Sequence, residues 1–233
     1  MLSAQLPPDE RRRLDALRLY DILDSEPEQS YDDLTYIASV ICQMPIVLVS
    51  LVDEHRQWFK SKRGLNVAET PRETSFCAHA ILDSGVMIVP DANQDQRFID
   101  NPLVVGDPSI RFYAGAPLYS SDGLALGTLC VIDRVPRTLT MDQIKALEAL
   151  ARQVSTLIQM RHTLHELHTA VSTIKLLGGI VPMCASCKKI READNRWLPL
   201  EEYIAGHTEA QVSHGICPEC AGVLYPQYFP TQP

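Results

Sequence analysis

The chain has 233 residues, enough for one domain of ordinary size and a small second module. Its composition, 45% hydrophobic and 21% charged, is that of a globular protein and excludes a disordered one. The net charge of -8 at pH 7 argues against a nucleic-acid-binding surface, and no apolar run reaches the about 18 residues of a membrane-spanning helix.

The N-terminal segment, residues 1–13, is polar and charged and lacks the apolar stretch of a signal peptide. We therefore expect a cytoplasmic protein with no membrane partner and no nucleic-acid partner. In that compartment thiols stay reduced, so paired cysteines indicate metal binding before disulfide formation.

The expected elements follow from the spacing of apolar residues, with three- and four-residue spacing for helices and β-branched runs for strands. Helices are expected at 9–24, at 32–42 with Asp32 or Asp33 as cap, at 75–82 with Thr74 or Ser75 as cap, and from Thr140 onward; strands are expected at 46–53, 57–62, 86–89, 112–119 and 124–133. Residues 64–74 are expected to be loop, and residues 90–110 loop or short helix. This order predicts an α+β domain in which helices pack against an antiparallel sheet.

The helix that begins near Thr140 is expected to be long and to end at Gly178 and Gly179. Its candidate seam residues follow alternating three- and four-residue spacing: Leu147, Leu150, Val154, Leu157, Arg161, Leu164, His168, Val171 and Lys175. This repeat predicts a dimeric coiled coil with polar interruptions, and the alternative is a long helix packed partly on its own domain. The expected domains are residues 1–140, a dimerisation helix at 141–178 and a cysteine-rich module at 180–226.

Two Cys-x-x-Cys pairs lie in that last module, Cys184 with Cys187 and Cys217 with Cys220. Four thiolates that arrive as two pairs suit the tetrahedral coordination of a structural Zn²⁺ ion. His214 is an alternative ligand or a hydrogen-bond partner of one. The other interpretations are cysteines that pack in a core and cysteines that form redox-switched disulfides.

The larger part of the chain resembles the GAF family of sensory domains. The resemblance rests on ERRRLDAL at 10–17, YDILD at 20–24, VSLVD at 49–53, QWFK at 57–60, SFCAHAI at 75–81, RFYAGAPL at 111–118 and GTLCVID at 127–133. It implies a six-stranded or similar antiparallel sheet with helices on one face and a ligand pocket on the other. It also implies a regulatory module, often dimeric.

The tail resembles a cysteine-rich module that follows bacterial GAF, PAS and receiver domains, on residues 180–191, Trp197, 200–204 and 213–220. That resemblance implies a role in signalling and no particular activity. No kinase, cyclase or phosphodiesterase signature is found in these residues. We therefore expect the output to be a signalling partner protein or the oligomeric state of the chain itself.

Six residues are candidates for the ligand pocket: Cys77, His79, Asp91, Arg111, Phe112 and Tyr113. The Cys-x-His unit suits attachment of a linear tetrapyrrole or coordination of a metal, and its alternative is core packing. The remaining four suit a small polar ligand such as a nucleotide or an organic acid, and their alternative is a solvated loop rich in turns. The cyclic-nucleotide string Asn-Lys-x-Phe-x-x-x-Asp-Glu is absent, so cyclic GMP is not favoured.

The sequence thus predicts a sensory module without catalytic residues, which binds a small ligand and signals through a dimeric helix to a zinc-stabilised tail. One alternative is a thiol-dependent reductase of methionine sulfoxide that uses Cys77 and Cys130, although the cysteine arrangement of that GAF branch does not match. The other alternative is an interaction protein with no ligand.

Overall fold

The computed structural model describes residues 1–177, 181–192, 194–207 and 211–228, with side chains described up to Val171 in the longest helix. The chain divides into two units, Met1–Leu167 and His168–Pro233. The expected helix end at Gly178 and Gly179 lies outside the described residues.

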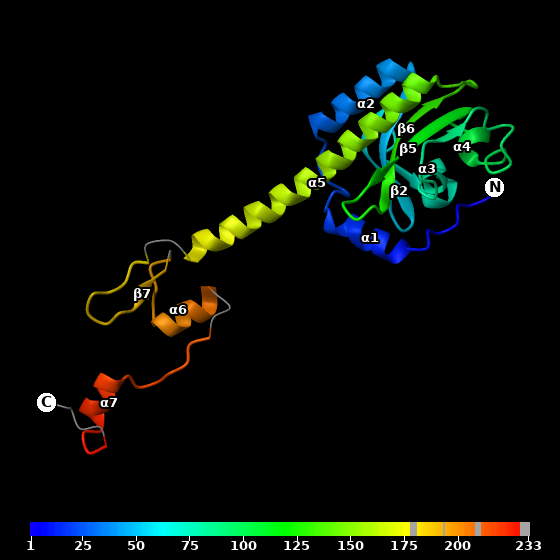
Figure 1. The fold of residues 1–233 in the computed structure, drawn as a ribbon. Coiled ribbons are helices and arrows are strands. Elements are labelled where there is room, and N and C mark those ends of the chain that lie inside the picture. Colours follow the sequence, from blue (N-terminus) through cyan, green and yellow to red (C-terminus); the bar gives the residue numbers. More distant parts are fainter. Residues whose placement is uncertain (178–180, 193, 208–210, 229–233) are drawn as a thin grey trace. The chain divides into compact units, whose positions relative to one another are not determined.

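The first unit is built on one six-stranded sheet (Figure 1). Its strands are β1 (Ile46–Val52), β2 (Arg56–Arg63), β3 (Glu69–Pro71), β4 (Met87–Val89), β5 (Phe112–Tyr119) and β6 (Ala125–Asp133), in the order β3-β2-β1-β6-β5-β4. Every pairing between neighbouring strands is antiparallel. The expected antiparallel sheet with flanking helices is therefore confirmed.

Helices cover both faces of this sheet (Figure 1). The first face carries α1 (Glu10–Leu19), α2 (Gln29–Cys42) and the first part of α5 (Met141–Leu177), and the second face carries η1 (Arg72–Thr74), α3 (Phe76–Ala80) and α4 (Pro102–Val105). Each face has its own buried apolar cluster. Because side chains alternate along a strand, adjacent residues of β5 serve different clusters: Phe112 the first and Tyr113 the second.

Several expected boundaries differ from the structure, and the first is the end of α1, which lies at Leu19 and not at Asp24. Helix α2 begins at Gln29, three residues earlier than Asp32, and the extended residue Glu28 precedes it without a side-chain capping bond. Asp32 instead accepts a hydrogen bond from Ser61 Oγ on β2 at 2.6 Å. The expected loop at 64–74 contains β3 and η1, since a three-residue strand that ends in Pro71 has no apolar alternation to signal it.

The first part of α5 packs on its own domain. Leu147 and Val154 are fully buried in the first cluster, and Leu150 and Leu157 pack against it. Gln143 Nε2 also donates to Ile41 O of α2 at 3.1 Å. The first half of the expected seam therefore packs against the domain of the same chain. In agreement with this packing, the compact unit extends to Leu167 and not to residue 140.

The second unit has little core in its described residues. Strands β7 (Ile190–Arg191) and β8 (Trp197–Leu198) form a hairpin, and the helices are α6 (Leu200–His207) and α7 (Pro218–Leu224). Ile190 and Ala221 are the apolar side chains that are buried among those described. A module with so few buried apolar groups needs another source of stability.

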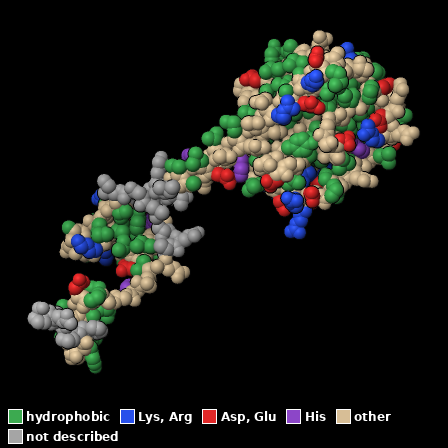
Figure 2. Space-filling view, viewed as in Figure 1, with side chains coloured by type: hydrophobic (Ala, Val, Ile, Leu, Met, Phe, Trp, Pro, Cys, Tyr) green, Lys and Arg blue, Asp and Glu red, His purple; other side chains and the backbone are tan. Residues whose placement is uncertain are grey.

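Within the described ranges, no helix is both long enough and apolar enough to cross a bilayer. On the face of the first unit seen in Figure 2, side chains of both charges are interspersed and do not gather into a patch of one sign.

Candidate functional site

The second face of the sheet holds a cavity of about 300 Å³. Its apolar lining is Leu48, Phe59, Leu65, Val67, Leu103, Pro108, Ile110 and Ile132, and its polar lining includes Gln57, Asn66, Thr70, Asp107 and Arg134. Strands β1, β2 and β6 supply its floor, and the segments at 64–70 and 103–110 supply the rest. Apolar walls with a few convergent polar groups are typical of sites for small molecules.

Two polar side chains of this cavity are held in place by neighbours. Gln57 Nε2 donates to Thr70 Oγ1 at 2.7 Å, and Arg134 Nε donates to Pro108 O at 3.0 Å. In the described part of the chain, no carboxylate lies within ion-pair distance of Arg134. Its guanidinium group is therefore available to an anionic ligand group.

A larger hollow of about 660 Å³ is a weaker candidate. Its charged side chains already pair with one another, Arg56 with Glu69 at 2.6 Å and Arg18 with Glu54 at 3.2 Å. The smaller, more enclosed cavity therefore remains the better candidate for a ligand site.

A buried polar chain connects the cavity to the start of α3. Ser75 Oγ caps this helix by accepting a hydrogen bond from Ala78 N at 3.0 Å, and it donates to Gln57 Oε1. Ser50 Oγ approaches the same oxygen at 3.5 Å. Gln57 thus connects the wall of the cavity to the cap of the helix that carries Cys77.

The thiols of Cys77 and Cys130 meet beneath α3, with 3.9 Å between their Sγ atoms. Tyr113 Oη donates to Cys77 Sγ at 3.4 Å and lies 3.4 Å from Thr128 Oγ1. Gly115 makes room for this phenol, because a Cβ atom there would lie 2.2 Å from Tyr113 Oη. The glycine in the AGAPL segment thus has a steric cause.

Burial raises the pKa of Cys130 and of Tyr113 well above their ordinary values, so both keep their protons and act as donors. Burial also opposes ionisation of Cys77, but hydrogen bonds outweigh it and lower the pKa of this thiol to about 6. The donors are Cys130, Ser50, Thr128 and Tyr113.

The structure brings only part of the expected pocket together. Cys77 and Tyr113 are in contact, whereas Phe112 lies on the opposite face of the sheet, and none of the six candidates lines the 300 Å³ cavity. The cavity residues Gln57, Asn66 and Arg134 were not expected from the sequence.

The other three candidates make local contacts. His79 Nε2 lies 3.1 Å from Leu2 O, and burial lowers the pKa of its ring. Asp91 accepts from the backbone N of Asn93 at 3.0 Å, as an aspartate in an ordinary turn does. Arg111 donates to Val104 O at 2.8 Å.

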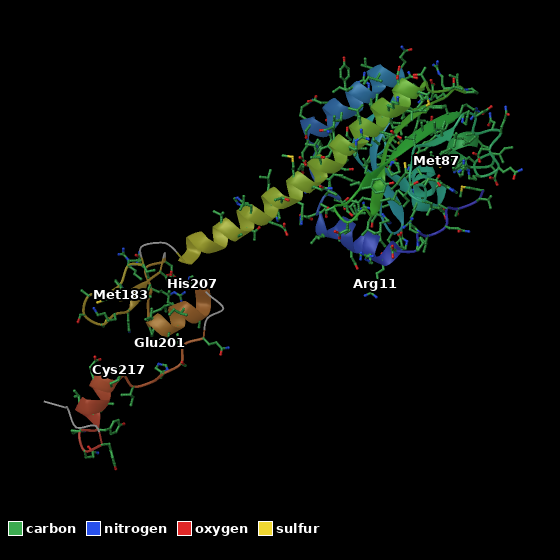
Figure 3. The ribbon with its side chains drawn as sticks, viewed as in Figure 1. Arg11, Met87, Met183, Glu201, His207 and Cys217 are labelled. Carbon is green, nitrogen blue, oxygen red and sulfur yellow. The ribbon has the colours of Figure 1, made fainter. Side chains whose placement is uncertain are left out.

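Each Cys-x-x-Cys pair forms a turn whose first sulfur accepts backbone hydrogen bonds. Backbone N–H groups of Cys187 and Ser186 point to Cys184 and lower the pKa of its thiol. Cys220 N donates to Cys217 Sγ at 3.4 Å, at the start of α7 (Figure 3). Across the described ranges, no three His, Cys, Asp or Glu side chains are grouped as metal ligands. The Zn²⁺ site thus stays a prediction.

The model of the GAF domain family matches residues 26–158. A protein named cyclic di-GMP phosphodiesterase from Pseudomonas aeruginosa is 45% identical over 165 residues, which make up 70% of this chain but only 28% of that protein. The chain therefore spans little more than a quarter of this relative.

Two solved structures are similar to part of this chain. The GAF domain of an Acinetobacter phosphoenolpyruvate-protein phosphotransferase has a TM-score of 0.50 at 20% identity, covering 65% of this chain and 95% of that one. A type II free methionine-R-sulfoxide reductase from Thermoplasma acidophilum has a TM-score of 0.48 at 11% identity, covering 63% and 96%. The first of these similarities, at 20% identity, concerns the fold alone. Because the family model covers more than half of its residues, the chain belongs to the GAF domain family.

Proposed function

We propose that the chain is a sensory GAF-domain protein that binds a small organic acid. Ligand binding changes the packing of a dimeric helix, and the helix transmits this change to a zinc-stabilised module. The observation that carries this proposal is the 300 Å³ cavity with an Arg134 guanidinium in its lining. A volume of this size is at the lower end of the range for ligand sites. The ligand is therefore a small molecule with an apolar body and an anionic group.

Strand β6 of the sheet contacts both the cavity and the cluster that contains α5. Ile132 of β6 lines the cavity, while the preceding residue Val131 belongs to the first cluster together with Leu147 and Val154 of α5. A ligand that shifts β6 thus acts on the packing of the helix through one strand.

An ion network around the buried Lys60 also joins α5 to the sheet. Lys60 Nζ, which is fully buried on β2, lies 2.7 Å from Glu28 Oε1, and Arg161 Nε of α5 lies 3.1 Å from the same oxygen. Removing the Glu28 carboxylate would leave the buried Lys60 charge without its anionic partner, which is costly. This network holds the position of α5 near the point where the helix leaves the domain core.

Three exposed apolar side chains support dimerisation through α5. Met160, Leu164 and Leu167 are 55%, 62% and 58% exposed and follow four- and three-residue spacing. This spacing places them on one face of the helix, as in a coiled-coil seam. Of the three, only Leu164 belongs to the repeat expected from the sequence. The row lies on a different face of α5 from Arg161 and His162, which still contact the domain.

The zinc module is proposed because its four cysteines are suitable Zn²⁺ ligands and lie in two turns. Four cysteines, three of them exposed, lie in turns whose backbone N–H groups already point to sulfur. Zn²⁺ would supply the folding free energy that the small core of this unit lacks. In this proposal the folded module presents a surface to a signalling partner.

The similarity to a protein named cyclic di-GMP phosphodiesterase supports a signalling role. The phosphodiesterase activity is not carried over, because the aligned segment is 28% of that protein. We propose regulation and not catalysis as the role of this chain.

Ligand-observed NMR with a library of small carboxylic acids and neutral analogues of the same size tests the proposal. We expect acids to bind the wild-type chain and to lose at least about tenfold in affinity in Arg134→Gln, since a charge-assisted contact is removed. Arg11→Gln, on the exposed face of α1 (Figure 3), is the matched control and should bind like wild type. Binding that is equal in all three proteins, or confined to neutral analogues, would contradict the proposed ligand class.

A further inference from the structure

Cys77 and Cys130 form an isolated thiol pair inside the second apolar cluster. The pair is 53 residues apart in sequence and comes from different elements, Cys77 from α3 and Cys130 from the central strand β6. Core packing alone requires no such meeting of two sulfur atoms.

The surroundings of the pair are unusually polar for a core. Thr128, Ser50 and Gln57 are buried next to it, together with the phenol group of Tyr113. Burying hydroxyl and amide groups is unfavourable unless they form hydrogen bonds, and apolar side chains of similar size would avoid that penalty. The donors surround Cys77 Sγ, so this polar set stabilises negative charge on that sulfur.

Cys42 provides an internal comparison. It is also buried, but it lies in the first apolar cluster, and burial alone raises the pKa of its thiol. A sulfur in such surroundings is an unreactive neutral thiol. The two environments predict that Cys77 reacts with an oxidant and Cys42 does not.

We propose that Cys77 and Cys130 form a reversible disulfide when the protein meets a small peroxide. The Cys77 thiolate attacks one oxygen of hydrogen peroxide, the O–O bond breaks, and a sulfenic acid and hydroxide form. The Cys130 thiol then attacks the sulfenic sulfur, the S–O bond breaks, and water leaves with the Cys130 proton. Two thiols and one peroxide thus give one disulfide and two waters, and a dithiol such as dithiothreitol reverses the reaction.

The geometry requires only a local shift. The sulfur atoms must approach from 3.9 Å to the bonded distance of about 2.05 Å. Cys130 is fixed in the middle of the sheet, whereas α3 is a five-residue helix held by its Ser75 cap. Movement of α3 is therefore expected to accompany the bond and to reach Gln57 in the cavity wall through Ser75. This modification site does not depend on the identity of the ligand.

Peptide mapping of the 233-residue chain after exposure to hydrogen peroxide tests the proposal. Free thiols are alkylated under denaturing conditions without reduction, so that each cysteine is reported separately. We expect a cross-linked peptide pair that contains Cys77 and Cys130 and disappears with dithiothreitol, while Cys42 remains fully alkylated. Recovery of both thiols in the free form, or cross-links of either one with other cysteines only, would overturn the proposal.

Variants sharpen this test. Cys42→Ser should keep the cross-link, and Cys130→Ser should abolish it and leave Cys77 as the sulfenic acid or its further oxidation products. Tyr113→Phe removes one donor to Cys77 Sγ, and we expect it to slow cross-linking about tenfold. An unchanged rate in Tyr113→Phe would refute activation by the polar set. The peptide map of the oxidised wild-type chain tests the proposal without any variant. A variant that fails to fold therefore does not prevent the test.

Discussion

Glu10 should stabilise the first unit in a pH-dependent way. Its carboxylate accepts two hydrogen bonds from Arg13 at 2.8 Å and one from Arg72. Arg13 is buried, with its side chain 2% exposed, and donates to Val52 O at 2.6 Å, so the cluster ties α1 to the end of β1. Burial of Glu10 opposes ionisation, but the hydrogen bonds and charges of the two arginines outweigh it and lower its pKa from 4.5 to about 2.

This shift has a definite sign. A carboxyl whose pKa is lower in the folded state adds stability above its unfolded pKa, and that stability is lost as the pH falls from 4.5 toward 2. The full difference between the unfolded and folded pKa values of Glu10 corresponds to about 3 kcal/mol of folding stability at pH 7. Glu10→Gln should therefore lower the free energy of unfolding by about 3 kcal/mol at pH 7 and by about half as much at pH 3.

Urea unfolding followed by tryptophan fluorescence measures this effect. The chain has two tryptophans, so a Trp197→Phe background leaves Trp58, buried in the first cluster, as the reporter of the first unit. Glu54→Gln is the control, because Glu54 forms an exposed ion pair with Arg18 and should change stability by less than about 1 kcal/mol. If Glu10→Gln lowers the free energy of unfolding by no more than the control does, or by as much at pH 3 as at pH 7, the argument is refuted.

Three further predictions concern the zinc module, the helix and the sheet. Removal of Zn²⁺ by a chelator should abolish hydrogen-exchange protection in residues 181–226 and leave 1–167 unchanged, since the metal supplies on the order of 10 kcal/mol of folding free energy; unchanged protection in the tail would count against the site. Leu164→Glu should weaken dimerisation about tenfold or more in sedimentation, because it puts a charge into the exposed apolar row, whereas Thr169→Glu, on the opposite face of the helix, should not; equal effects would argue against this seam. Gly115→Ala should destabilise the first unit by about 1–3 kcal/mol in thermal unfolding, because its Cβ would collide with Tyr113 Oη; an unchanged melting temperature would show that the phenol moves freely.

Much of the sheet could be predicted from local patterns. The buried strand β1 is a run of apolar and β-branched residues, and the Ser75 cap marks the start of α3, so both elements were expected near their observed bounds. Strand β3 was missed because its three residues are defined only by backbone pairing with β2. The start of α2 was misplaced because the side chain of Asp32 serves Ser61 on the sheet, a contact that no local pattern reports.

The cavity could not be derived from local patterns for a different reason. Gln57, Asn66, Asp107 and Arg134 belong to separate strands and loops, and only the sheet order brings them together. The sulfur pair has the same origin, since Cys130 meets Cys77 across 53 residues. In the long helix, the regular repeat did not distinguish Leu147, which packs inside the domain, from Leu164, which is exposed.

Native mass spectrometry of the purified 233-residue chain tests the central proposal most directly, because one spectrum reports oligomeric state, metal content and any retained small molecule. We predict a dimer with one Zn²⁺ per chain. Gas-phase dissociation of the wild-type dimer should release an acidic small molecule, and Arg134→Gln should retain none. A metal-free monomer that also binds no member of the acid library would contradict the account of a ligand-gated, zinc-stabilised dimer.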